Sequence, residues 1–160
     1  MNKIRVPLAT YLLAEGPEIL ACYGIGSCVV VVLYDQQRKL AAMAHVVLPG
    51  RGKEGKDGLS AKYSDEAIEG MLKELLRRGS SREQLMAKIA GGAQMFVFSS
   101  PPLEDPPGRR NVEAVIKKLN QEGIPVVAAD VGKNFGRSVE FHPDSARMII
   151  KTVSEGTREI

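Results

Sequence analysis

The sequence contains no tryptophan, and aromatic residues make up only 5% of its 160 residues. It also lacks a strong charge of either sign, because 22 lysine and arginine residues oppose 19 aspartate and glutamate residues and leave a net charge of +3. The basic residues are scattered along the chain, and no basic stripe alternates with aromatic side chains. Such a stripe is typical of nucleic-acid-binding proteins, so we expect no nucleic-acid partner.

Long hydrophobic runs are absent as well. Apolar stretches such as VVVVL and HVVLP are far shorter than the roughly 20 residues that cross a bilayer. The opening residues MNKIRVPLATYLLAEG show neither the long apolar segment nor the cleavage site of a signal peptide. We therefore expect a cytoplasmic protein that does not insert into membranes.

Cysteine and histidine are scarce, with two residues of each. In a reducing compartment, a pair of cysteines is not expected to form a structural disulfide. No group of cysteine and histidine residues has the spacing of a zinc site, so we expect no bound metal.

The residues that are present predict a single α/β domain at 1–153, with a mixed sheet in layers and a frayed tail at 154–160. Apolar and β-branched runs predict strands at 6–14, 28–35, 38–48, 88–98, 124–131, 137–141 and 147–153. Helical spacing of apolar residues predicts helices at 64–79 and 111–123, and a capping-box pattern predicts a short helix after Ser81. Ser64 is the expected N-cap of the first helix. The segments 49–63 and 99–110 are expected to be loops, the first of them mobile and next to the functional site.

A glycine turn, GIGSC, delivers Cys28 directly into an apolar strand. If the following hairpin is symmetric about Gln36 and Gln37, directly opposed residues have numbers that add up to 73, as those of Cys28 and His45 do. The two side chains would then face each other with Cβ atoms roughly 5 Å apart. A histidine at that distance could ionise the thiol and lower its pKa, and N–H groups near Gly26 and Ser27 could hold an oxyanion.

Ordinary structural roles explain the same residues. A cysteine that enters an apolar strand is most often a small buried residue, and His45 could be a core histidine with one hydrogen bond. Cys22 is expected in the core. A dinucleotide site is a poor explanation of the Gly-x-Gly turn, because the helix start and downstream acid are missing.

The combined motifs resemble the CheD family of chemoreceptor glutamine deamidases. The likeness rests on YGIGSCVVVVLYD, MAHVVLP, AKIAGGAQMF, RNVEAVIKKLNQEGIPVVAADVG and GRSVEFHPDSARMIIK, and it reaches from the first strand to Lys151. The resemblance implies a layered α/β fold with packed mixed β-sheets flanked by helices, similar to the catalytic domains of deamidating toxins. It also implies hydrolysis of glutamine side chains in the helical cytoplasmic region of chemoreceptors, without a cofactor.

The resemblance assigns roles to individual residues. Cys28 falls on the family's nucleophile and His45 on its general acid and base, while Cys22 occupies the position of a family threonine that orients the histidine. A CheC-type phosphatase is the implied partner, and a mainly regulatory binding role is the alternative function. A third possibility is a general thiol hydrolase or esterase, but no specificity motif supports it.

Overall fold

The computed structural model describes residues 2–52, 60–95 and 105–160, and its strands form two five-stranded sheets. The first sheet has the order β1-β3-β8-β9-β10. Its strands are β1 (Lys3–Arg5), β3 (Ile19–Ile25), β8 (Arg137–His142), β9 (Arg147–Thr152) and β10 (Gly156–Glu159). Within this sheet β1 runs parallel to β3, and the other neighbours are antiparallel.

The second sheet has the order β2-β5-β4-β6-β7. Its strands are β2 (Tyr11–Glu15), β5 (Leu40–Val46), β4 (Val29–Asp35), β6 (Leu85–Gly91) and β7 (Val126–Val131). Only the β6–β7 pair among these is parallel. The single α/β domain with mixed sheets that the sequence predicted is therefore confirmed.

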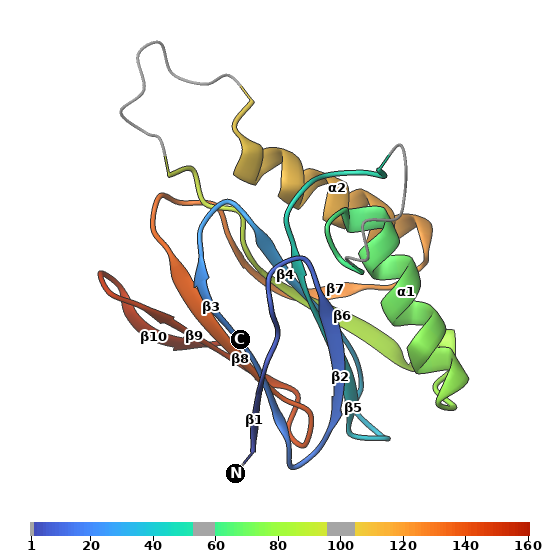
Figure 1. Ribbon diagram of the computed structural model, residues 1–160. Helices are drawn as coiled ribbons and strands as arrows, with labels where there is room; N and C mark the ends of the chain where they lie inside the picture. Colours follow the sequence, from blue (N-terminus) through green and yellow to red (C-terminus); the bar gives the residue numbers. More distant parts are fainter. Residues whose placement is uncertain (1, 53–59, 96–104) are drawn as a thin grey trace.

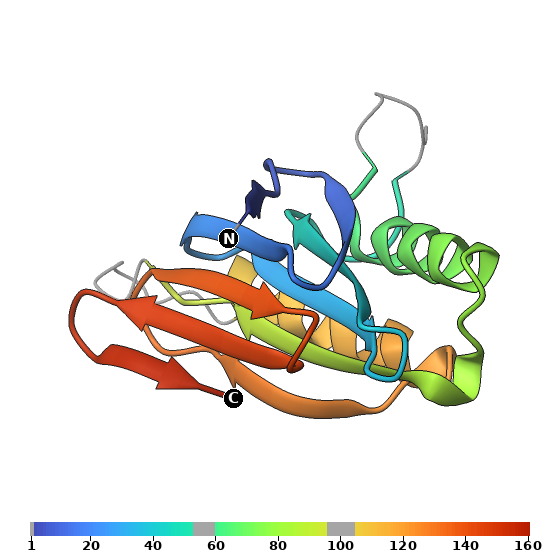
Figure 2. The ribbon, with the colours of Figure 1, turned by 90° about the horizontal axis from the view of Figure 1, so that it is seen from below.

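Two helices, α1 (Ser64–Arg77) and α2 (Pro107–Gln121), cover the face of the second sheet that points away from the first. Strands β9 and β10 lie on the opposite side of the molecule from α1 (Figures 1 and 2). The chain thus forms three layers, with one apolar core between the helices and the second sheet and another between the two sheets.

Strand β4 lies at the centre of this arrangement. Val29, Val31 and Leu33 belong to the core under the helices, whereas Val30 and Val32 belong to the core between the sheets. A strand covered on both faces has no polar side to present to water, which explains its unbroken apolar sequence.

Several expected elements differ from the structure. The expected strand at 6–14 is replaced by β1 and β2, and β3 lies where only a turn was recognised. The prediction of a frayed tail at 154–160 is wrong, because 156–159 form β10, which pairs with β9. Helix α2 begins at Pro107 and not at Asn111, since proline suits the first helical turn.

The expected caps also differ. Ser64 lies inside α1, whose N-cap is Tyr63, and its hydroxyl instead accepts a hydrogen bond from the Gly50 N–H at 2.8 Å. The short helix η1 (Arg82–Gln84) is a single 3₁₀ turn without a side-chain cap at Ser81. Part of the predicted loop at 49–63, residues 53–59, lies outside the described residues, as does half of 99–110, residues 99–104.

A charged group links the two helices. Glu69 of α1 accepts hydrogen bonds from Arg51, which follows β5, and from the Lys118 ammonium of α2 at 2.7 Å. Arg51 first and Lys118 second lower the pKa of Glu69 to about 2.

Candidate active site

Cys28 lies in the short connection between β3 and β4, one residue before β4 begins. Its side chain is half-buried and packs against the core between the two sheets. Three consecutive carbonyl groups of this connection accept hydrogen bonds, two from the segment after β6 and one from α2. Gly26 O accepts from Ala93 N at 3.0 Å, Ser27 O from Asn111 Nδ2 at 3.0 Å, and Cys28 O from Gly92 N at 2.7 Å.

The glycine pair after β6 makes this close approach possible. Gly91 has a φ of +111°, which L-residues rarely adopt, and a Cβ atom there would lie only 2.4 Å from Cys28 O. Gly91 and Gly92 therefore allow a close backbone approach. The segment that they pack against is the one that carries Cys28.

The N–H groups of Ser27 and Cys28 have no hydrogen-bond acceptor in another residue within 2–52, 60–95 and 105–160. Unpaired N–H groups near a potential nucleophile are the donors that an oxyanion site requires. The N–H of Cys28 also favours the thiolate form of its own side chain.

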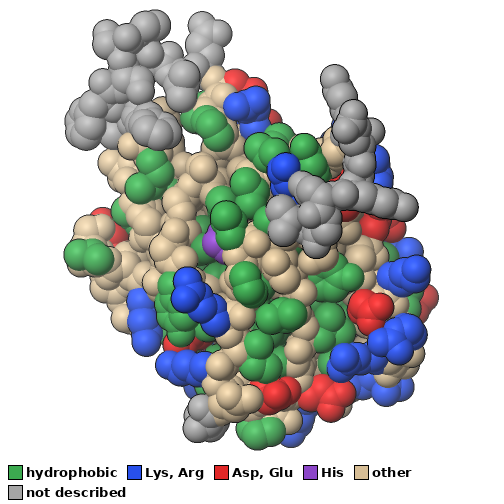
Figure 3. Space-filling view, in the orientation of Figure 1, with side chains coloured by type: hydrophobic (Ala, Val, Ile, Leu, Met, Phe, Trp, Pro, Cys, Tyr) green, Lys and Arg blue, Asp and Glu red, His purple; other side chains and the backbone are tan. Residues whose placement is uncertain are grey.

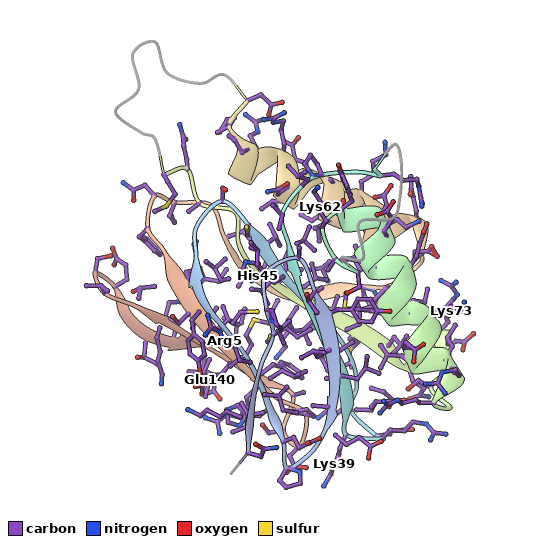
Figure 4. The ribbon with its side chains drawn as sticks, viewed as in Figure 1. Arg5, Lys39, His45, Lys62, Lys73 and Glu140 are labelled. Carbon is purple, nitrogen blue, oxygen red and sulfur yellow. The ribbon has the colours of Figure 1, made fainter. Side chains whose placement is uncertain are left out.

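His45 is the penultimate residue of β5, and its side chain is 8% exposed. Its backbone is fixed by hydrogen bonds with the segment before β2, from His45 N to Thr10 O and from Ala9 N to His45 O, both at 3.0 Å. In Figure 4 His45 lies near the middle of the molecule, and Figure 3, in the same view, shows a histidine side chain reaching the surface there among hydrophobic side chains.

The predicted direct opposition of Cys28 and His45 is wrong by two residues. His45 pairs with Val30, because Asp35 pairs with Leu40 and the connecting turn therefore spans four residues. Side chains alternate between the two faces of a strand, so a shift of two residues keeps both side chains on the same face. If the ladder extended by one pair, Cys28 and His45 would be diagonal neighbours, with Cα atoms about 7–8 Å apart.

Burial dominates the electrostatics of both groups. It raises the pKa of the Cys28 thiol above its ordinary value of 9.0, and the residue's own N–H opposes this shift. Burial also lowers the pKa of His45 below 6.5. The expected lowering of the thiol pKa by an imidazolium is therefore not found, and both shifts favour the uncharged forms, a thiol at Cys28 and a neutral imidazole at His45.

Cys22 lies in β3 and is fully buried, as predicted. Its thiol points to Val6 O at 3.7 Å and to the Met43 sulfur at 3.6 Å. Burial, followed by the nearby Cys28, raises the pKa of Cys22 to about 12. In the part of the chain that the structure describes, Cys22 forms no hydrogen bond with His45, so its role as the group that orients the imidazole stays a prediction.

Sequence reasoning did not find Asn111. This residue lies on the buried face of α2, where it is followed at helical spacing by Val115 and Leu119. A polar residue in line with apolar positions was the available signal. Its amide donates to Ser27 O and also to Val47 O, both at 3.0 Å, and so links the segments that carry Cys28 and His45.

The described residues contain neither a metal-binding cluster nor a membrane-spanning helix. No cluster of three or more histidine, cysteine, aspartate or glutamate side chains could hold a metal ion there. No helix in those segments is long and apolar enough to span a membrane.

Comparison with known proteins identifies the family. The family model described as CheD chemotactic sensory transduction matches residues 47–152. The chain belongs to the CheD family. This CheD-family chain is 43% identical over 157 residues to a protein named probable chemoreceptor glutamine deamidase CheD from Lachnoclostridium phytofermentans, with 98% of each chain covered.

A second relative supports the same assignment across the region of Cys28. The chain is 44% identical over 158 residues to the chemoreceptor glutamine deamidase CheD of Halalkalibacterium halodurans, again covering 98% of both. Among solved structures, the hypothetical protein YfiH of Bacillus licheniformis aligns with a TM-score of 0.47 and 19% identity, over 78% of this chain and 50% of that one. The resemblance to CheD proteins that the sequence motifs indicated is confirmed.

Proposed function

We propose that this protein is a cytoplasmic cysteine-dependent deamidase that converts glutamine side chains of chemoreceptors to glutamate in chemotaxis. The observation that carries the proposal is the arrangement around Cys28. A half-buried thiol directly precedes β4, whose partner strand β5 carries His45, and the N–H groups of Ser27 and Cys28 have no acceptor in another described residue. Relatives that share 43–44% of the sequence are named chemoreceptor glutamine deamidases, which gives the substrate class.

The proposed reaction begins from the neutral pair. The sulfur of Cys28 attacks the carboxamide carbon of the substrate while the thiol proton moves to the neutral imidazole of His45. The carbonyl oxygen gains negative charge, and the N–H groups of Ser27 and Cys28 donate hydrogen bonds to it. The imidazolium then gives its proton to the departing nitrogen, so that ammonia leaves and a thioester to Cys28 remains.

Hydrolysis of the thioester completes the cycle. Neutral His45 removes a proton from water, and the resulting hydroxide adds to the thioester carbon. Breaking of the carbon–sulfur bond releases glutamate, and the proton on His45 returns to the sulfur. Both half-reactions use one imidazole, which needs a pKa low enough to act as a base at neutral pH. The lowered pKa of His45 meets that need.

Exposed apolar side chains near the site suit a protein substrate. Leu48 follows the strand of His45 and is 38% exposed, and Met95, which is 45% exposed, lies next to Gly26. Apolar groups at the surface beside a reactive residue can hold the apolar side of a helix. We propose that a receptor helix docks there with its glutamine directed to Cys28.

The direct test is mass spectrometry of a purified receptor fragment incubated with the protein. Each deamidation raises the fragment mass by roughly one dalton, because an amide becomes an acid. Cys28→Ala and His45→Ala should abolish the gain, whereas Ser80→Ala is the control, because Ser80 bonds to Asp35 at the far end of β4, and should retain it. An equal mass gain with Cys28→Ala would remove the proposed nucleophile.

A regulatory role is the alternative, in which a CheC-type phosphatase is the main partner. The same assay separates the two functions when the phosphatase is added. A receptor fragment that stays unchanged, combined with binding of the phosphatase by calorimetry, would favour the regulatory role. Deamidation that the added phosphatase merely modulates would favour catalysis.

A further inference from the structure

Asn111 connects the two halves of the candidate site. It is 1% exposed on α2, and each hydrogen of its amide has one acceptor. The acceptors are Ser27 O, in the residue before Cys28, and Val47 O, two residues after His45, both at 3.0 Å. One rigid planar group therefore fixes the separation between the segment that carries the thiol and the strand end that carries the imidazole.

The hydrogen bond from Asn111 to Ser27 O also fixes the direction in which the Cys28 N–H points. In a trans peptide the C=O and the N–H point to opposite sides of the chain. Asn111 holds the Ser27 carbonyl toward α2, on the helix side of the second sheet, so the Cys28 N–H of the same peptide points away from α2. The Cys28 side chain also lies on that opposite side, in the core between the sheets.

The neighbouring peptides support this orientation. Ala93 N holds the carbonyl of Gly26, which fixes the peptide that carries the Ser27 N–H in the same manner. Two of these restraints come from backbone N–H groups, which every residue except proline can supply. Only the middle restraint, on the Ser27 carbonyl, depends on a side chain, and that side chain is Asn111.

Stability alone is a weak reason for asparagine at this position. The Asn111 Oδ1 atom is buried and has no hydrogen-bond partner within the described residues. A buried, unsatisfied acceptor costs about as much free energy as two neutral hydrogen bonds contribute, so the two amide bonds are largely offset. The arrangement therefore contributes more to geometry than to the free energy of folding.

We propose that Asn111 is a positioning residue that orients the Ser27–Cys28 peptide and sets its distance from the strand of His45. Its effect on catalysis rests on the proposed deamidation, but its effect on the thiol does not. Loss of the amide lets the Ser27–Cys28 peptide rotate, so the Cys28 N–H is no longer held beside the sulfur. The thiolate and the oxyanion then both lose a fixed donor.

The test compares Asn111→Leu, which keeps the side-chain shape, and Asn111→Ala with the control Ser80→Ala. Ser80 is also buried and donates one hydrogen bond, to Asp35 at 2.8 Å, but it lies at the opposite end of β4. Two quantities are measured below the unfolding temperature of every variant. They are kcat and KM for deamidation of a receptor fragment, and the rate constant for alkylation of Cys28 by iodoacetamide at pH 8, located by peptide mass spectrometry.

We expect both Asn111 variants to lower kcat roughly 10- to 100-fold with little change in KM, and to slow alkylation of Cys28 several-fold. Ser80→Ala should lower the unfolding temperature and leave both rates unchanged. Wild-type rates in Asn111→Leu, or equal losses in Ser80→Ala, would overturn the proposal. If the wild-type protein does not deamidate the fragment but the Asn111 variants still slow alkylation selectively, the positioning role holds and the proposed function fails.

Discussion

Gly108→Ala tests how closely α2 must approach the segment that carries Cys28. Gly108 is buried in the first turn of α2, and a Cβ atom there would lie 2.4 Å from Ala93 O and 2.5 Å from Gly92 O. Ordinary contact begins near 3.4 Å, so one side must move by about 1 Å. Both obstacles are backbone atoms, which cannot be relieved by a side-chain rotation.

Either movement disturbs the Cys28 segment. If the Gly92 and Ala93 segment retreats, the 2.7 Å hydrogen bond from Gly92 N to Cys28 O lengthens to about 3.7 Å and is lost. If α2 retreats, the bond from Asn111 to Ser27 O stretches in the same way. A misplacement of about 1 Å at a reacting group costs on the order of 100-fold in rate.

Helix propensity alone predicts that Gly108→Ala stabilises the protein, whereas we expect a net destabilisation. Replacing a helical glycine by alanine contributes up to about 1 kcal/mol of stability. Overpacking costs about 1–3 kcal/mol, and a buried group that loses its hydrogen bond costs about 1–3 kcal/mol more. We expect a net loss of about 2 kcal/mol for Gly108→Ala, which lowers the unfolding temperature of a chain of this size by roughly 4–8 °C.

Thermal unfolding followed by circular dichroism, together with the deamidation assay, checks both parts. Gly136→Ala is the control, because its Cβ atom would lie 3.6 Å from Ile25 O, in ordinary contact. That variant should change the unfolding free energy by less than about 0.5 kcal/mol. A Gly108→Ala protein that is more stable than wild type and fully active would refute the reasoning.

Three further predictions concern the thiol, the helix contact and the core. Alkylation of Cys28 should rise with pH toward a midpoint above the ordinary 9.0, because burial raises its pKa, and a midpoint below 7 would contradict a neutral resting pair. Arg51 and Lys118 lower the pKa of Glu69 from 4.5 to about 2, so this carboxylate stabilises the fold above pH 4.5 and the effect is lost as pH falls toward 2. Lys118→Met should thus lower the unfolding temperature by a few degrees at pH 7 but not at pH 2, and an equal loss at both would exclude the charge effect. Phe141→Ala removes a fully buried ring and should cost about 3–5 kcal/mol in denaturant unfolding, and a loss below 1 kcal/mol would contradict its place in the core.

The sequence predicted the central elements because burial on both faces leaves an unmistakable pattern. The run of valines in β4 and the amphipathic face of α1 follow directly from where water is excluded. Strand β3 was missed because Gly24 and Gly26 resemble a turn, although the paired part of the strand extends to Ile25. Strand β10 was missed because all its residues are exposed and give no apolar pattern, so it is held by backbone pairing with β9 and by ion pairs of Arg158 with Asp130 and of Glu159 with Arg147.

The candidate site shows a similar division between local and non-local information. Its parts, Cys28 and His45, could be selected from residue type and approximate spacing. Their register could not, because a four-residue turn depends on Lys39 adopting a φ of +53°, which residue type does not reveal. Asn111 acts across 84 positions of sequence, and nothing local to either segment indicates that contact.

The double burial of β4 has a consequence for motion. Its amide hydrogens are enclosed by strands on both edges and by apolar layers on both faces, so they should exchange with solvent only when the whole domain opens. Cys28 stands at the end of this most protected strand, while the described surface around it is built from connections between elements. Substitutions in those connections can therefore alter the surface around Cys28 while its backbone position stays fixed by β4.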